Sequence, residues 1–152
     1  MAVPKDSVPE TILLVDDDSD AVLLFERAYQ RAGVTHLFKV AQSADDAIAY
    51  LTGDGRYADR AAYPMPALIL LDIKMPGRTG FDVLEWIRKN SPVTPMRVVM
   101  LTGSPDGADV NRAYRMGANS YLTKPTDLTE FREILCTLCA HWLRDSKRPE
   151  LN

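Results

Sequence analysis

The sequence predicts an α/β fold with a parallel sheet, and three observations indicate it. Short apolar segments alternate with amphipathic helical segments along the chain. One apolar segment, residues 67–71 with the sequence ALILL, has no polar position, which suits a strand covered on both faces. Glycine or serine stands at several points where a helix is expected to begin or end. We expect five strands, five helices and right-handed crossovers between the strands.

The predicted strands are runs of four or five mostly apolar residues. They are residues 11–15, 36–40, 67–71, 97–101 and 119–122. The predicted helices are residues 20–32, 43–51, 81–89, 105–116 and 126–143. Gly33 and Gly117 follow the first and fourth helices as stops, and Ser43 is a suitable N-cap for the second, with Asp46 completing a capping box. Residues 53–66 form a longer polar connection.

The bulk composition indicates one ordinary globular domain. The chain has 152 residues, of which 46% are hydrophobic and 26% charged. We place the domain at residues 10–143, with tails at 1–9 and 144–152, and expect no output domain. The net charge is -3 without a basic block, so a nucleic-acid partner is not expected. No apolar run suits a membrane span or a signal peptide, so we expect a cytoplasmic protein.

The last helix leaves two interpretations open. Cys139 and Leu143 extend its apolar stripe beside Trp142, which fits either core packing or an exposed patch for a homodimer. Cys136 and Cys139 have the spacing of a redox pair, but their place late in a helical pattern favours ordinary helix thiols.

Polar side chains follow four of the five predicted strands. In an open α/β sheet, ligands bind beyond the carboxyl ends of the strands, so these residues are candidates for a site. They are Asp16, Asp17 and Asp18 after the first strand, Asp72 after the third, Thr102 after the fourth and Lys124 after the fifth.

Acids in this number indicate a cation between them. Neighbouring carboxylates raise one another's pKa values unless a cation lies among them. Oxygen ligands select Mg²⁺, Ca²⁺ or Mn²⁺, and Mg²⁺ fits best because the EF-hand spacing is absent. No histidine or cysteine lies at this edge, which disfavours zinc.

Mg²⁺, a spare carboxylate, a lysine and a hydroxyl together form a set for phosphoryl transfer. A carboxylate can accept the phosphoryl group covalently. Lys124 and Thr102 would each take a phosphoryl oxygen, so that catalysis rests on positioning and charge neutralisation.

Four motifs in order along the chain resemble those of response-regulator receiver domains. They are LLVDDD, LLDIKMPGRTG, VMLTGS and GANSYLTKP, and the likeness spans about residues 10–143. The resemblance implies a flavodoxin-like, doubly wound sheet of five parallel strands in the order 2-1-3-4-5.

The resemblance also assigns roles to the residues at the strand ends. It implies that Asp72 is the phosphoacceptor, that Asp16 and Asp17 bind Mg²⁺, and that the backbone carbonyl of Lys74 is a further metal ligand.

Three more residues acquire roles in the same way. Thr102 and Lys124 would contact the phosphoryl group, and Thr102 and Tyr121 would switch on phosphorylation. The bond between Lys124 and Pro125 would be cis, as is usual in that family.

A receiver domain implies partners rather than an enzyme with a separate substrate. The phosphoryl donor would be a histidine kinase, and the length of residues 53–66 resembles regulators that pair with phytochrome-type kinases. With no output domain, the phosphorylated surface would act in trans on a downstream protein or a phosphotransfer protein.

Two alternatives use the same residues differently. A haloacid-dehalogenase-like phosphatase would place its nucleophile in the D-x-D of residues 16–18, which leaves Asp72 unexplained. A phosphorylation-independent interaction module usually lacks an acid or the lysine, and this chain has all of them. In the receiver interpretation Asp18 is a loop or helix-start residue rather than a ligand.

Overall fold

A computed structural model describes residues 9–90, 96–103 and 107–143. Its five strands form one parallel sheet in the order β2-β1-β3-β4-β5, which confirms the predicted doubly wound, flavodoxin-like fold. Among the described residues, no helix is both long and apolar enough to cross a membrane.

The elements lie within one or two residues of the predicted bounds wherever both ends are described. The strands are β1 (Thr11–Val15), β2 (Leu37–Ala41), β3 (Leu68–Asp72), β4 (Arg97–Thr102) and β5 (Ser120–Thr123). The helices are α1 (Ser19–Ala32), α2 (Ala44–Thr52), α3 (Gly80–Asn90), α4 (Gly107–Arg115) and α5 (Leu128–Trp142). The predicted start of α4 at residue 105 lies outside the described residues.

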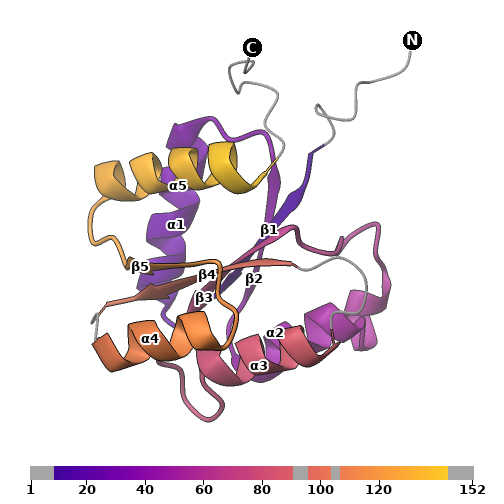
Figure 1. Cartoon of the computed structure of the whole chain (residues 1–152). Coiled ribbons are helices and arrows are strands. Elements are labelled where there is room, and N and C mark those ends of the chain that lie inside the picture. Colours follow the sequence, from indigo (N-terminus) through magenta and orange to yellow (C-terminus); the bar gives the residue numbers. More distant parts are fainter. Residues whose placement is uncertain (1–8, 91–95, 104–106, 144–152) are drawn as a thin grey trace, which may run out of the picture.

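The helices cover both faces of the sheet. In Figure 1, α1 and α5 lie on one side, and α2, α3 and α4 lie on the other. Every residue of β1 and β3 is buried, as expected for central strands of a sheet with helices on both faces.

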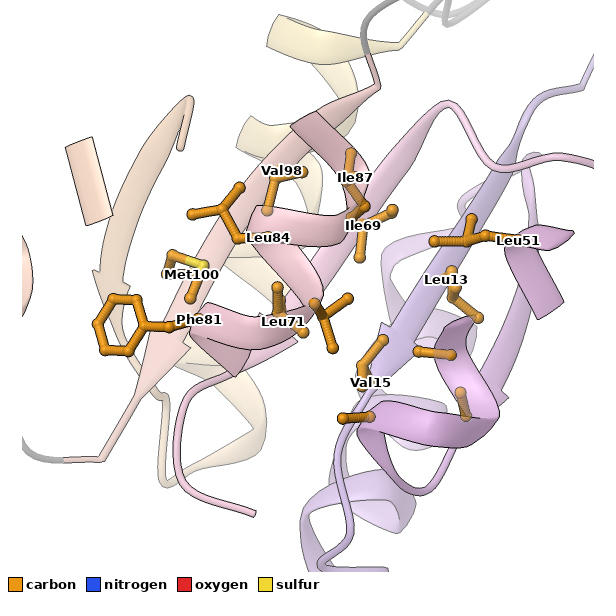
Figure 2. Packing of buried hydrophobic residues seen from close by; sticks show 14 of the residues in the cluster. Leu13, Val15, Leu51, Ile69, Leu71, Phe81, Leu84, Ile87, Val98 and Met100 are labelled. Atoms are coloured by element: carbon orange, nitrogen blue, oxygen red, sulfur yellow. The ribbon is translucent and has the colours of Figure 1, made fainter. Parts of the chain in front are cut away.

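Alternate residues of the central strands feed two separate cores. On the α3 side, Leu13, Ile69 and Leu71 pack in one cluster with Leu84 and Ile87 (Figure 2). On the α1 and α5 side, the intervening residues pack against aromatic rings of the two helices: Ile12, Leu14, Leu68 and Leu70 join Phe25 and Phe131. This alternation follows from the two-residue period of a strand.

The predicted cap at Ser43 and the predicted stop at Gly33 are confirmed, and Asp18, expected as a loop or helix-start residue, caps α1. The side chain of Asp18 accepts a hydrogen bond from the N–H of Asp20 at 3.0 Å, so Asp18 is the N-cap of α1. The hydroxyl of Ser43 accepts one from the N–H of Asp46 at 3.0 Å and caps α2. Gly33 ends α1 with φ of 65°, a conformation that favours glycine.

The structure decides part of the question about α5. Cys139 and Leu143 are buried in the core beside α1, so neither belongs to an exposed patch. Cys136 is exposed, and within the described part of the chain neither cysteine forms a disulfide. Trp142 is only partly buried, so it lies where the core meets the surface.

The connection between α2 and β3 is more ordered than its polar sequence predicts. It contains a short 3-10 helix, η2 (Gly55–Ala58), and the rings of Tyr50, Tyr57 and Tyr63 contact one another. The guanidinium of Arg60 donates to the carbonyls of Tyr50 and Leu51 at 2.7 and 3.0 Å. These bonds satisfy carbonyls at the end of α2, which explains why a polar segment can hold one conformation.

Candidate functional site

The site lies where neighbouring strand connections leave the sheet in opposite directions. From β1 the chain crosses to β2 at one edge, and from β3 it crosses to β4 on the other side. Such a switch point opens a crevice beyond the carboxyl ends of the two central strands. Asp16 directly follows β1, and Asp72 is the last residue of β3.

Three of the predicted acids meet in this crevice. Carboxylate oxygens of Asp16, Asp17 and Asp72 all lie within 4.8 Å of one another. Asp16 is 2% exposed and Asp72 8%, whereas Asp17 is exposed. Asp18 points to the backbone instead, and its N–H donates to the Asp16 carboxylate at 2.9 Å.

Lys124, which directly follows the edge strand β5, brings one positive charge to the cluster. Its Nζ lies 2.5 Å from an Asp16 carboxylate oxygen and 3.5 Å from one of Asp72. The pKa of Lys124 is raised above its ordinary value, because the hydrogen bond and charge of Asp16 outweigh the lowering by burial.

Asp72 has an unusual protonation equilibrium. The pKa of its carboxyl is raised to about 6, chiefly by burial and also by the charge of Asp16, although the charge and hydrogen bond of Lys124 oppose the shift. The N–H of Lys74 also donates to this carboxylate. Keeping the Asp72 carboxylate charged in the folded protein therefore costs free energy.

Thr102 and Tyr121 lie on the neighbouring pair of strands. Thr102 ends β4 and is 1% exposed, and its carbonyl accepts a hydrogen bond from the N–H of Lys124 at 2.6 Å. Tyr121 pairs with Met100 across the two strands and packs, partly buried, against the α3-side core. The described residues contain no cis peptide bond, so the expectation for Lys124–Pro125 is wrong here, and that bond has the lower-energy trans form.

Gly80 is a site residue that the sequence analysis did not single out. A Cβ at this position would lie 2.2 Å from the carbonyl oxygen of Asp72, so only glycine fits. Its N–H donates to the carbonyl of Ile73 at 2.9 Å and closes the loop that follows the acceptor strand. The sequence contained one signal for this role, because Gly80 is the last residue of the LLDIKMPGRTG motif and directly precedes the predicted helix of residues 81–89.

The donor set fits a hard divalent cation. Three carboxylates face one ammonium group, so the cluster carries excess negative charge. All three acids offer oxygen ligands, and one of them is open to water, which suits an ion that keeps part of its hydration shell. The carbonyl of Lys74 stays a prediction as a further ligand.

Comparisons with known proteins identify the family to which this fold and sequence belong. Residues 12–136 match the model of the response regulator receiver domain. The response regulator Rcp1 of Synechocystis is 30% identical over 141 residues, which cover 93% of this chain and 94% of Rcp1. The crystal structure of its Mn²⁺-bound form aligns with a TM-score of 0.76.

Two further solved structures are similar in sequence and fold. RPA3017, a response regulator in red-light signalling of R. palustris, is 28% identical with a TM-score of 0.82, over 95% of this chain and 100% of that one. The phosphorylated cyanobacterial phytochrome response regulator RcpA is 29% identical with a TM-score of 0.78, over 89% and 94%. The chain therefore belongs to the response regulator receiver domains of two-component signalling.

Proposed function

We propose that Asp72 accepts a phosphoryl group from the phosphohistidine of a partner histidine kinase. The observation that carries the proposal is the shared crevice of Asp72, Asp16, Asp17 and Lys124. A carboxylate oxygen of Asp72 forms a bond to phosphorus while the bond from phosphorus to the imidazole nitrogen breaks. The imidazole leaves with the electron pair and takes up a proton from water.

In this proposal the acids bind the metal ion, and the lysine contacts the phosphoryl oxygens. Asp16, Asp17 and the Lys74 carbonyl would hold Mg²⁺ together with Asp72. When bound, Mg²⁺ supplies positive charge that offsets the phosphoryl oxygens. Lys124, already between Asp16 and Asp72, turns from a carboxylate partner to a phosphoryl partner without leaving the crevice.

Thr102 and Tyr121 couple the new group to the surface. The phosphoryl group adds about 1.5 to 2 negative charges beside a buried hydroxyl, and Thr102 moves to donate to it. Tyr121, two positions before Thr123, the strand partner of Thr102, then turns inward. The surface of α4, β5 and α5 changes and is read in trans by a downstream protein or a phosphotransfer protein.

The kinase in this proposal is of the phytochrome type. RcpA is a phytochrome response regulator and RPA3017 acts in red-light signalling, and each is similar to this chain over most of its length. The proposal includes the cytoplasmic location expected from the sequence and a protein that transforms no separate substrate. Transfer of the phosphoryl group from an autophosphorylated phytochrome-type kinase to this chain is the expected result, and failure with every such kinase tried would contradict this part.

The chemical part is tested with acetyl phosphate as donor and intact-mass spectrometry. We expect one phosphoryl adduct in the presence of Mg²⁺ and none after chelation. Asp72→Asn should abolish the adduct, while Asp45→Asn, at an exposed position on α2, should leave it unchanged. An adduct that persists in Asp72→Asn would overturn the assignment, and turnover of a generic phosphate ester would favour the phosphatase alternative.

We further propose that α5 forms a homodimer with a second copy of the chain. Between β5 and α5 lies a hollow of about 420 Å³ lined by Leu122, Ile134 and Trp142. Glu130 and Glu133 lie at one end of this face, and Arg97 lies over the ring of Trp142 at the other. An antiparallel pairing of two copies therefore brings opposite charges together.

Light scattering after size exclusion tests the dimer. We expect Trp142→Ala to lower the measured mass toward that of a monomer, and Leu23→Ala, an exposed apolar position on α1, to leave it unchanged. A monomeric wild type at every concentration and phosphorylation state would contradict the proposal.

A further inference from the structure

The guanidinium of Arg88, near the end of α3, donates four hydrogen bonds to segments beyond its own helix. Its Nε and Nη2 donate to the carbonyl of Gly117 at 2.9 and 2.7 Å, and its Nη1 donates to the carbonyl of Met96 at 2.8 Å. Nη2 also donates to the side-chain oxygen of Asn119 at 2.9 Å. One guanidinium thus ties the end of α3 to the residue before β4 and to two residues of the connection between α4 and β5.

This arrangement is not an ion pair. Among the residues that the structure describes, the partners of Arg88 are carbonyl and amide oxygens, and no carboxylate receives it. Burial and the nearby charge of Arg97 lower the pKa of Arg88 from its ordinary value. Because these partners of the half-buried Arg88 are neutral, we attribute its role to geometry rather than to charge pairing. The planar guanidinium can align several acceptors at once.

The acceptors define the alignment of β5 with β4. Asn119 pairs in both directions with Val98, because its backbone N–H donates to the Val98 carbonyl and its side chain accepts from the Val98 N–H, each at 2.8 Å. Gly117, with φ of 98°, brings its backbone against the Arg88 side chain, where a Cβ would lie 3.0 Å from Nε. Arg88 therefore fixes the point at which β5 begins.

The side chains of β5 specify its register less strongly than the fully buried side chains of β1 and β3 specify theirs. β5 has four residues, none of them fully buried, and in the sheet of the described residues it is an edge strand beside β4. A slip of one residue would turn each side chain to the opposite face of the sheet. Lys124 directly follows this strand, so its entry into the acidic crevice depends on where β5 begins.

We propose that Arg88 is a positioning residue for Lys124, acting through Asn119 and the register of β5. Asn119 and Lys124 are five positions apart, so the anchor acts over roughly 16 Å along an extended strand. The inference rests on the proposed phosphoryl transfer, in which Lys124 contacts the incoming group. It assigns a role in that reaction to a residue that lies near the amino ends of β4 and β5, whereas the acidic crevice lies at the carboxyl ends of the strands.

A double-mutant cycle tests the proposal, with the rate of acyl phosphate formation from acetyl phosphate at saturating Mg²⁺ as the readout. Arg88→Lys keeps the charge but loses the planar fork, and Lys124→Met removes the ammonium group. We expect Arg88→Lys to slow labelling roughly tenfold, since misplacing a reacting group by about 1 Å can cost as much as 100-fold. In the Lys124→Met background the same change should alter the rate less than about twofold.

The matched control is Lys89→Met. Lys89 is the next residue of α3, with its side chain exposed and paired only with Glu85, so this variant should label at the wild-type rate. An equal slowing by Arg88→Lys in both backgrounds, or none in either, would overturn the inference. If Lys124→Met alone labels like the wild type, the proposed role of Lys124 fails instead, so the two failures are distinguishable.

Hydrogen exchange supplies a second readout that needs no phosphoryl donor. The Lys124 N–H donates to Thr102 at the end of the strand pair, so its protection reports the register directly. Arg88→Lys should lower protection there and leave the amide of Leu70 in β3 unchanged. If Arg88→Lys does not fold, Asn119→Leu takes its place, with Asn119→Asp, which keeps the acceptor oxygen, expected to restore protection. Unchanged protection of Lys124 in the folded variants would overturn the inference.

Discussion

Every residue of β1 and β3 is buried, whereas β5 has no fully buried residue and α4 buries only Ala113. The two regions serve the same site in different ways. The carboxylates that require fixed positions follow the two central strands. Tyr121 lies in β5 and Lys124 directly follows it, beside α4, and these are two of the residues that we propose respond to a phosphoryl group. The acids thus lie at the ends of fully buried strands, whereas the residues proposed to switch lie on or beside the least buried strand of the described sheet.

The largest contrast is expected in the free energy of unfolding. Leu70→Ala empties a fully buried position in β3 and should lower it by about 2–5 kcal/mol. Tyr114→Ala removes a ring from α4 that is 49% exposed and should change it by less than about 0.5 kcal/mol. Urea unfolding of both variants measures this, and equal losses would remove the distinction between centre and flank.

The charged carboxylate of Asp72, at the end of β3, should lower the free energy of unfolding by a measurable amount. Because the folded state raises the pKa of Asp72 to about 6, it binds an extra proton between pH 4 and 6. The contribution of Asp72 to the stability of the wild type therefore falls as the pH rises through this window, when a chelator keeps metal away. Asp72→Asn should be more stable than the wild type by about 1–3 kcal/mol at pH 7, since one pKa unit corresponds to about 1.4 kcal/mol.

The pH dependence provides the control for this prediction. The stability difference between Asp72→Asn and the wild type should be small near pH 4 and should open between pH 4 and 6. A difference that is constant from pH 4 to pH 7 would show that the asparagine acts through packing rather than through charge.

The smallest expected effect concerns the attachment of α4. The guanidinium of the exposed Arg112 lies 4.2 Å from the ring centre of the buried Phe81 on α3, a cation–π contact of about 0.5–1 kcal/mol. Arg112→Ala should raise hydrogen exchange in α4 with little change in overall stability, whereas Arg115→Ala, also exposed on α4, should not. A loss above about 2 kcal/mol would mean that α4 is part of the rigid centre.

The sequence predicts the centre of the molecule better than its flank. The apolar runs of β1, β3 and β4 and the caps at Asp18 and Ser43 act locally, so their patterns are readable in the chain itself. The acids at the strand ends could be predicted because parallel strands bring their carboxyl ends to one edge.

Other features depend on contacts between distant segments. The close approach of Gly80 to Asp72 and the bonds of Arg88 to Gly117 exist only after folding. The ordered connection of residues 53–66 arises from tyrosine rings and Arg60 packed around α2, which no period in the sequence reveals. Burial of Cys139 and Leu143 likewise depends on where α1 lies.

The proposed phosphoacceptor is the carboxylate of Asp72 at the end of β3. Borohydride converts an acyl phosphate of aspartate to homoserine, so reduction after labelling with acetyl phosphate and Mg²⁺ marks the acceptor position. Trypsin places Asp72 and the acids that follow β1 in different peptides, residues 61–74 and 6–27. We predict homoserine at position 72 alone. Homoserine at position 16 or 17 instead would contradict the account and assign the nucleophile to the end of β1.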